Sequence, residues 1–356
     1  MAGMEAAAGI LRNVSFAKSA AVKSSDGLEA KSAAGKSGDE RKNIIAAAIF
    51  FIGLVLILAL LSNAVKPEFG EVYDIVAVHD KLQALSLEKP GTIDVYFAGN
   101  SEAYRSFSPL QLWEDYGFTS YCVAGSALRL CDNCEIIKAS ADMQQPKMIV
   151  LETDAIFSDS SPHKDSYALP TNLIEDIFPI FHYHIFYKAH MPKFVDAANP
   201  IKRDAYLLKG YVQSDAVVPY TGPTDYMAHG TKGRILNDAL EYLNEIHRYC
   251  RENGIELIIA AVPCPQHWNM GKSEAMQRWC DKAKVPFVDM NLMLDEIGIN
   301  WAEDSMDGGN HVNLAGSIKV TECIGDFIND NYDLPDHTGD PDYSEWDELF
   351  VESELY

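Results

Sequence analysis

The chain has 356 residues, of which 47% are hydrophobic, so it is long enough for one large domain or two small ones with appended segments. Its formal net charge is −23, from 29 basic and 52 acidic residues. Proteins that bind nucleic acid meet the phosphates with basic side chains, so this charge argues against a nucleic-acid partner.

Residues 44–65 contain no charged side chain and are apolar on every side of a helix. About 20 such residues cross the hydrocarbon core of a bilayer, so this segment is predicted to be a transmembrane helix that contacts membrane lipid. Residues 1–43 are rich in Ala, Ser, Gly and Lys and are predicted to be a disordered tail. Residues 66–90 are predicted to be a juxtamembrane linker.

The charges that flank the apolar segment predict its orientation. Arg41 and Lys42 precede it, whereas Lys66, Glu68 and Glu71 follow it. The positive-inside rule then places the N-terminus in the cytoplasm and the rest of the chain outside the cell membrane. A cleaved signal peptide is the alternative, but the residues before the apolar segment are too many for an ordinary n-region, so we favour an uncleaved signal-anchor.

The remaining sequence alternates apolar runs with helical patterns. Continuous hydrophobicity is typical of strands buried on both faces of a parallel sheet. The predicted strands are 93–98, 119–124, 147–153, 255–263 and 286–290, and the predicted helices are 109–116, 132–143, 233–254 and 313–330. Strands that alternate with helices predict an α/β fold, a three-layer α/β/α sandwich with a parallel sheet of about five strands, over residues 91–330.

Two segments depart from this rhythm. Residues 154–232 are rich in Pro, Tyr and His and are predicted to be an insertion, which either covers an edge of the sheet, faces the membrane or forms an ordinary cap on the core. From Asp330 to Tyr356 there are ten acidic residues and no basic one, so residues 331–356 are predicted to be an extended, solvated acidic tail.

Seven cysteines follow the apolar segment, and an odd number leaves at least one unpaired. Cys131 and Cys134 form a Cys-x-x-Cys pattern that is compatible with a redox pair, a short disulfide or half of a metal site. Because no second such pair and no histidine pair accompanies it, we expect no metal, and we favour two cysteines at the start of a helix.

The first predicted strand ends in the turn Gly99-Asn100-Ser101, which presents a serine. Ligands of open parallel sheets bind outside the carboxyl ends of the strands, so Ser101 lies where a nucleophile is useful. A serine hydroxyl needs a base within hydrogen-bond reach. His311, in the loop before the last predicted helix, is the candidate base, and Asp307 is placed to orient its ring.

Three features together resemble the SGNH (GDSL-like) hydrolase superfamily: Gly-Asn-Ser after the first strand, the small-residue turn Gly125-Ser126 after the second, and Asp…His-x-Asn-x-x-Gly before the last helix. The stretches that carry the closer likeness are "GNSEAYRSFSPLQLWEDYG", "QQPKMIVLE" and "DGGNHVNLAGSIKVT". Their wording is similar to the membrane-anchored bacterial branch, whose members help to O-acetylate alginate or D-alanylate teichoic acids. The resemblance implies a flavodoxin-like fold and acyl-ester chemistry without metal or organic cofactor. It implies attack by Ser101, proton transfer by His311, orientation by Asp307, and an oxyanion hole formed by the amides of Ser101 and Gly125.

This sequence departs from the family pattern in two places. The family aspartate stands three residues before the histidine, where this chain has Gly308, so Asp307 or, as the weaker choice, Asp304 must serve instead. The asparagine that the family uses after the third strand is replaced by Thr153 and Asp154. His184, in the insertion, is a substitute donor.

The predicted function is a membrane-anchored extracytoplasmic serine esterase or O-acyltransferase that acts on an acylated cell-surface glycan or envelope polymer. A transferase would need a multi-span membrane acyltransferase as partner, because one span does not carry an acyl group across a bilayer. The alternatives are a non-catalytic binding or assembly protein with the same fold, and a thiol redox protein. His267 and Trp268, after the fourth strand, are further candidates for lining the site.

Overall fold

The computed structural model describes residues 29–65, 78–86, 88–157, 178, 207–228 and 233–353. The chain divides into two compact units, Met1–Leu61 and Ser62–Tyr356. Each unit is described by itself.

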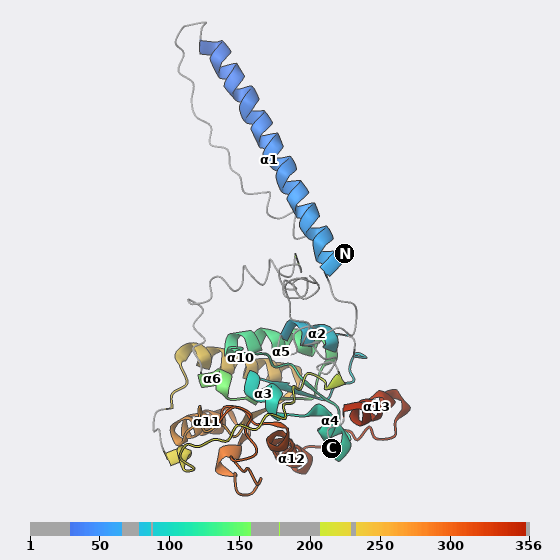
Figure 1. The fold of residues 1–356 in the computed structure, drawn as a ribbon, viewed down its shortest axis with the longest axis vertical. Helices are drawn as coiled ribbons and strands as arrows, with labels where there is room; N and C mark the ends of the chain where they lie inside the picture. The colour runs from blue at the N-terminus through green and yellow to red at the C-terminus, as the bar shows by residue number, and fades with distance from the viewer. Residues whose placement is uncertain are drawn as a thin grey trace. The chain divides into compact units, whose positions relative to one another are not determined.

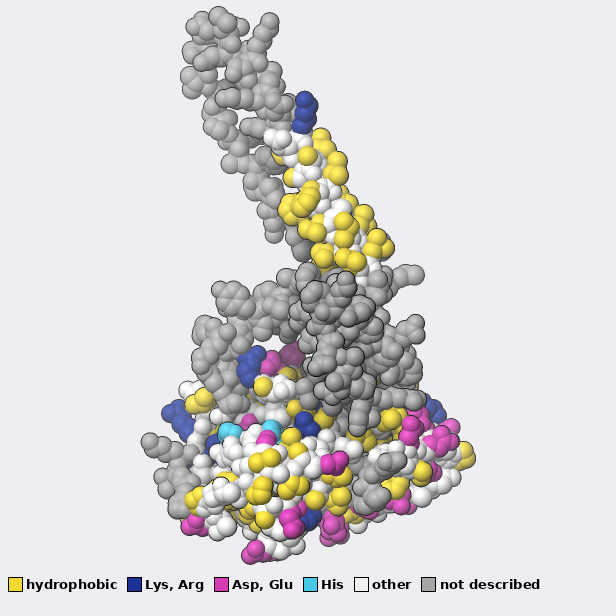
Figure 2. All heavy atoms as spheres, in the orientation of Figure 1, with side chains coloured by type: hydrophobic (Ala, Val, Ile, Leu, Met, Phe, Trp, Pro, Cys, Tyr) yellow, Lys and Arg dark blue, Asp and Glu magenta, His cyan; other side chains and the backbone are white. Residues whose placement is uncertain are grey.

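A single long helix, α1 (Glu29–Val65), contains the predicted apolar segment. Within it, Arg41–Ser62 is long and apolar enough to cross a membrane. Large hydrophobic side chains such as Ile49 and Phe50, 66% and 65% exposed, cover its surface, as the yellow atoms in Figure 2 show. One such helix near the N-terminus fits a membrane anchor and a signal sequence equally, so the choice of an anchor stays a prediction.

The second unit is built on a five-stranded parallel sheet with the order β2-β1-β3-β4-β5. The strands are β1 (Val95–Ala98), β2 (Ser120–Cys122), β3 (Met148–Glu152), β4 (Glu256–Ala261) and β5 (Phe287–Asp289). The chain runs from β1 outward to β2 and then crosses back to β3. The strand order therefore reverses at the carboxyl ends of β1 and β3, which is where ligands bind in such sheets.

Helices cover both faces of this sheet, which confirms the predicted three-layer fold (Figure 1). The α-helices among the described residues of the unit are α2 (Val78–Leu85), α3 (Ser101–Ser106), α4 (Pro109–Tyr116), α5 (Leu130–Gln144), α6 (Asp154–Phe157), α10 (Asn237–Asn253), α11 (Met270–Ala283), α12 (Leu314–Asn331) and α13 (Ser344–Ser353). Short 3₁₀ turns lie at Tyr226–Ala228, Met290–Leu292 and Pro341–Tyr343.

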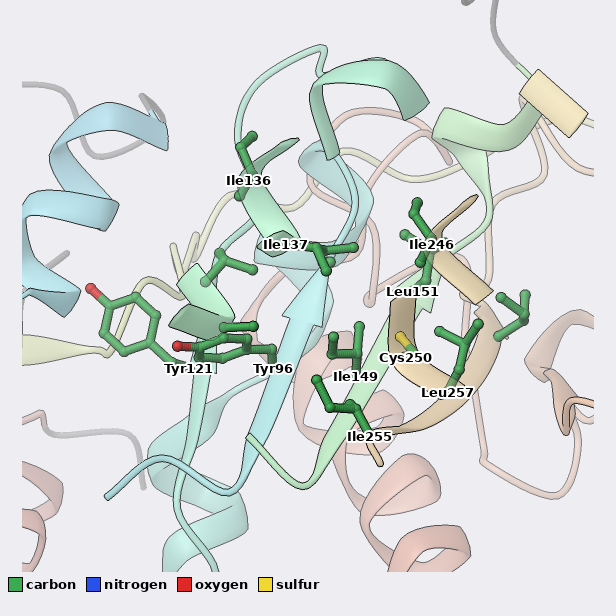
Figure 3. Packing of buried hydrophobic residues seen from close by; sticks show 14 of the residues in the cluster. Tyr96, Tyr121, Ile136, Ile137, Ile149, Leu151, Ile246, Cys250, Ile255 and Leu257 are labelled. Carbon is green, nitrogen blue, oxygen red and sulfur yellow. The ribbon is translucent and has the colours of Figure 1, made fainter. Parts of the chain in front are cut away.

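Alternate strand residues supply the two cores. Tyr96 and Ile149 pack with residues of α5 and α10 on one face, as Figure 3 shows, whereas Phe97 and Val150 pack with α3 and α12 on the other. All four side chains are fully buried. The continuous apolar runs of the sequence arise because each strand feeds both cores.

Most predicted elements are present with shifted ends. The helix predicted over 109–116 has these bounds because Pro109 occupies its first turn and Gly117, at φ +74°, ends it. Asn313 caps α12 by accepting a hydrogen bond from the Gly316 amide at 3.1 Å. Five of the described helices were not predicted: α2, which lies inside the segment assigned as a linker, and α3, α6, α11 and α13.

The C-terminal segment is not the extended, solvated arm predicted for residues 331–356. Within α13, Trp346 and Leu349 are only 3% and 6% exposed. The Trp346 ring lies 5.6 Å from that of Trp113 in α4, whose indole nitrogen donates to Asp347 at 2.9 Å. The acidic composition of this segment led to the prediction of a solvated arm, although Trp346 and Leu349 stand at helical spacing. Burial of these two side chains holds the helix against the domain.

Within the predicted insertion, the described residues 207–228 lie against the carboxyl end of the sheet. The Cys122 amide donates to the Lys209 carbonyl, and the Val212 amide donates to that of Tyr104 in α3, both at 2.9 Å. Arg105, also in α3, donates to the Val212 carbonyl at 3.1 Å. This segment is therefore a cap on the core; residues 158–177, which precede Phe178, residues 179–206, which include His184, and residues 229–232 lie outside the described residues.

The docking of α13 gives a stability prediction. We expect Trp346→Ala to lower the free energy of unfolding by about 3 kcal/mol, because a buried indole leaves a cavity. Val351→Ala on the same helix is the control, because Val351 is 77% exposed and its loss costs little. Urea unfolding of the detergent-solubilised chain, followed by circular dichroism, measures both. Equal effects of the two changes would contradict the docking.

Candidate active site

The turn after β1 places Ser101 at the carboxyl end of the sheet. Gly99 has φ +145°, and a Cβ there would lie 2.9 Å from that of Glu152, so this turn requires glycine. Asn100 caps α3: its side-chain oxygen accepts from the Glu102 amide at 3.1 Å, and its amide nitrogen donates to Asp154 Oδ2 at 2.6 Å. Ser101 is consequently the first residue of a short helix whose start is held on both sides.

His311 lies in a loop closed by a bridge between Ser305 and Val312. Asp307 Oδ1 accepts the backbone amides of Asn310 and His311 at 3.2 and 2.8 Å. Its other oxygen, Oδ2, lies 2.5 Å from His311 Nδ1. One carboxylate therefore shapes the loop and orients the imidazole ring at the same time.

The Asp–His spacing, one residue longer than the family pattern, is accommodated by glycine. Gly308 and Gly309 have φ +81° and +95°, so the chain turns back and the carboxylate four positions earlier reaches the ring. The alternative, Asp304, is engaged elsewhere: its Oδ2 binds Lys319 Nζ at 2.6 Å.

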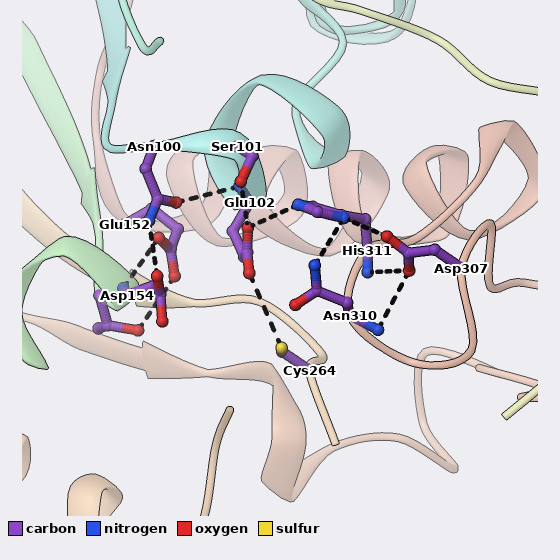
Figure 4. A network of polar contacts seen from close by, with 10 residues as sticks. Asn100, Ser101, Glu102, Glu152, Asp154, Cys264, Asp307, Asn310 and His311 are labelled. Carbon is purple, nitrogen blue, oxygen red and sulfur yellow. Dashed lines mark hydrogen bonds and ion pairs between the residues drawn. The ribbon is translucent and has the colours of Figure 1, made fainter. Parts of the chain in front are cut away.

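Ser101 and His311 approach the same oxygen atom from two sides (Figure 4). The Ser101 hydroxyl donates to Glu102 Oε2 at 3.0 Å, and His311 Nε2 lies 3.1 Å from that oxygen. Ser101 and His311 therefore lie together at one edge of the sheet, and the separation of Ser101 Oγ from His311 Nε2 is at most the sum of these two distances. Nε2 is close enough for an ion pair but outside hydrogen-bond geometry, and it has no hydrogen-bond partner among the described residues.

Glu102, which the sequence interpretation did not single out, dominates the electrostatics of this site. It is only 3% exposed. Burial acts to lower the pKa of His311, but the carboxylates of Glu102 and Asp307 outweigh it and raise that pKa. Burial acts to raise the pKa of Asp307, and contact with His311 outweighs it, so that pKa is lowered. The position of Glu102 directly after the serine was the one available signal.

A second buried acid stands behind the turn, at the end of β3. Glu152 is 1% exposed, and burial, followed by the nearby charges of Asp154 and Glu102, raises its pKa well above the usual value. It accepts hydrogen bonds from the Thr153 hydroxyl at 3.1 Å and the Asp154 amide at 2.9 Å. Burial thus favours the neutral form of Glu152. The residues that follow it at this strand end are Thr153 and Asp154, and not an asparagine.

The other predicted residues contribute less to the described geometry. Gly125 is buried in the loop after β2, the neighbour of β1, so it belongs to the same edge of the sheet. No described hydrogen bond joins it to Ser101, and its oxyanion role stays a prediction. Trp268 is buried and donates to Asp289 at 3.1 Å, which makes it a packing residue, and His267 is exposed.

The cysteines do not form a reactive centre. All seven are free thiols, and Cys131 and Cys134 lie at the start of α5, as favoured from the sequence. Burial raises the pKa of Cys131, and it raises that of Cys134 to about 11, whereas a redox thiol needs a lowered pKa. In the described part of the chain no three His, Cys, Asp or Glu side chains are placed to hold a metal ion.

Comparisons with known proteins give structural likeness only. No family model matches the chain, and no curated protein matches it. Among solved structures, a candidate platelet activating factor from Streptococcus pneumonia is 13% identical, with a TM-score of 0.38 over 80% of this chain and 99% of that one. A candidate acylhydrolase from Bacteroides fragilis is 12% identical, with a TM-score of 0.35 over 74% and 99% of the two chains.

A GDSL-like lipase from Bacteroides thetaiotaomicron is 10% identical, with a TM-score of 0.36 over 72% of this chain and 99% of that one. At TM-scores this low, none of these likenesses carries an argument about what this chain does. The fold class rests on the strand order and the two layers of helices described above.

The two carboxylates around His311 make stability depend on pH with a definite sign. The folded-state pKa lies above the unfolded value of 6.5, so His311 stabilises the fold fully below pH 6.5 and loses this contribution as the pH rises through the folded pKa. We expect His311→Asn to be most destabilising below pH 6.5 and progressively less so above it. Denaturant unfolding across a pH series tests this, with exposed His267→Asn as control. A destabilisation that grows with pH contradicts the ion pairs.

Proposed function

We propose that this chain is a membrane-anchored serine esterase or O-acyltransferase that uses Ser101, His311 and Asp307. The observation that carries the proposal is the meeting of Ser101 Oγ and His311 Nε2 at one buried oxygen of Glu102, with Asp307 on the opposite ring nitrogen. Serine, histidine and aspartate in this order of contact are the parts of an acyl-transfer site. Their place at the switch point of a parallel sheet supports it.

The mechanism follows from the contacts. Ser101 Oγ attacks the acyl carbonyl, and His311 takes the hydroxyl proton on Nε2, the ring nitrogen without a hydrogen-bond partner among the described residues. Asp307 holds Nδ1, which orients the ring and stabilises its charged form. The developing oxyanion needs amide donors, and we assign them to Ser101 and Gly125; each such donor contributes about 3 kcal/mol of transition-state stabilisation.

Hydrolysis and transfer differ only in whether water or a hydroxyl of an acceptor attacks the acyl-enzyme. We propose an acylated glycan or envelope polymer as the substrate, because a domain anchored beside a membrane meets surface polymers first. A transferase would receive its acyl group through a multi-span membrane acyltransferase. The strongly negative chain repels anionic polymers over distance, so salt should promote access of such a polymer to the site.

A fluorophosphonate probe tests the nucleophile directly, because it reacts with activated serines. We expect the detergent-solubilised chain to be labelled once, and Ser101→Ala to lose at least about 99% of the labelling rate, since attack by any other group lacks the base. Ser344→Ala, on the distant α13, is the matched control and should be labelled like the parent chain. Labelling that survives Ser101→Ala would place the nucleophile elsewhere.

The same experiment decides the second candidate, a non-catalytic binding or assembly protein. One observation favours it: the Ser101 hydroxyl donates to Glu102, and not to His311. A folded chain that takes up no probe at any pH supports this candidate.

Membrane anchoring has its own test. We expect the chain to stay with the membrane fraction after alkaline and high-salt washes, and a protease added outside intact cells to cut only residues beyond the apolar helix. A variant without residues 1–65 is the control and should be released to the soluble fraction. If cells that express the full-length gene product yield a soluble chain that begins after about residue 65, the apolar segment is a cleaved signal peptide.

A further inference from the structure

Glu102 is a buried carboxylate with a single basic contact. Its side chain is 4% exposed, and among the described residues His311 is the only basic side chain that forms an ion pair with it. On its other side, Cys264 Sγ lies 3.9 Å from Oε1. A buried carboxylate without a basic partner is costly, so the contact with Glu102 favours the protonated form of His311.

This arrangement conflicts with the task of a general base. A protonated imidazole donates through both nitrogens and has no lone pair with which to accept a proton. In addition, the Ser101 hydroxyl points its proton at Glu102 Oε2, at 3.0 Å, and not at the ring. To reach the reactive arrangement, His311 must therefore lose the proton on Nε2, and the Ser101 hydroxyl must rotate toward that nitrogen.

We propose that Glu102 is a positioning residue that restrains the catalytic pair: it keeps His311 charged and holds the Ser101 hydroxyl away from the ring. The inference rests on the proposed esterase or acyltransferase function. On this proposal Glu102, which is not part of the Ser–His–Asp set, determines the pH above which Ser101 reacts.

The groups that face this pair come from four parts of the fold. Glu102 stands on α3, and Asp307 and Asn310 lie in the loop that carries His311 (Figure 4). Behind Glu102, burial raises the pKa of Cys264 and that of Glu152, at the end of β3, well above their usual values. Within the described residues, Glu102 and Asp307 are thus the charged groups in contact with the ring.

Every proton is accounted for when His311 becomes neutral and Ser101 reacts. As the pH rises, His311 gives the Nε2 proton to water and regains a lone pair. Ser101 then turns its hydroxyl toward Nε2; the bond between Oγ and the acyl carbon forms while the Oγ–H bond breaks, and the proton moves to Nε2. When the ester C–O bond breaks, the leaving alcohol takes that proton, which restores neutral His311 and leaves acylated Ser101.

The test is the pH dependence of fluorophosphonate labelling in Glu102→Gln. Glutamine keeps the shape and removes the charge, and an opposite charge within ~4–6 Å shifts a pKa by ~1–3 units. We expect the labelling midpoint to move to lower pH, with a rate about fivefold above the parent at one pH unit below the parent midpoint. Glu102→Asp keeps the charge and should leave the midpoint close to that of the parent.

Glu152→Gln is the matched control for loss of a buried acid. Glu152 is buried in the same network, burial raises its pKa, and no described hydrogen bond or ion pair joins it to His311, so its replacement should leave the midpoint in place. A midpoint that does not move in Glu102→Gln overturns the proposal. Labelling that falls at every pH does so too, because Glu102 would then be the base itself.

A second readout separates this proposal from the proposed function. Nuclear magnetic resonance titration of the His311 imidazole, assigned by its loss in His311→Asn, reports the charge on the ring without any reaction. We expect the ring to titrate at lower pH in Glu102→Gln than in the parent chain. If the parent takes up no probe, the esterase proposal fails while the titration still decides whether Glu102 controls the ring; an unchanged titration refutes that control.

Discussion

His311 lies between two carboxylates, Asp307 and Glu102, in a site largely removed from water. The placement of the imidazole ring between two carboxylates is the constraint on which the local chemistry depends. Asp307 orients the ring through Nδ1. Glu102 occupies the space beside Nε2, where a hydroxyl would have to lie in order to give its proton to the ring. The charge of the imidazole is therefore set by packing as much as by solvent.

Three separate stretches of chain supply this arrangement: the turn after β1, the end of β3, and the loop before α12. They converge because all the strands are parallel and all their carboxyl ends lie at one edge. The contact of Gly99 with Glu152 brings the first two together, since a side chain at Gly99 would overlap the strand end. The described part of the insertion then covers α3 from outside through Arg105 and Val212.

The fold was predictable from the sequence to the extent that local pattern encodes it. Continuous apolar runs revealed all five strands, because each strand is buried on both faces, and proline and asparagine marked two helix starts. The pattern failed for α13, where acidic residues outweigh the two apolar side chains that dock it. The strength of that docking comes from Trp113, far away in sequence, so composition alone pointed to a solvated arm.

The candidate site was predictable in a similar way. Ser101, Asp307 and His311 could be found because each stands in a recognisable local context: a strand-ending turn, or a glycine-containing loop before a capped helix. Glu102 stood next to Ser101 in plain view, yet nothing in its neighbours along the chain showed that its side chain would fold inward. Its direction depends on the space that the His311 loop and Cys264 leave beside it.

By itself, the sequence determined an apolar segment of membrane-spanning length, the alternation of strands and helices, and the identity of a serine, a histidine and an aspartate at one edge of a sheet. The apolar segment and the alternation follow from composition and from the periods of helix and strand, which act over a few residues, whereas the three residues follow from their local motifs and the resemblance that these carry. Only the tertiary structure decided which oxygen lies against Nε2 and where the serine proton points. Such contacts join residues some two hundred positions apart, and side-chain packing, which no local period records, selects among them.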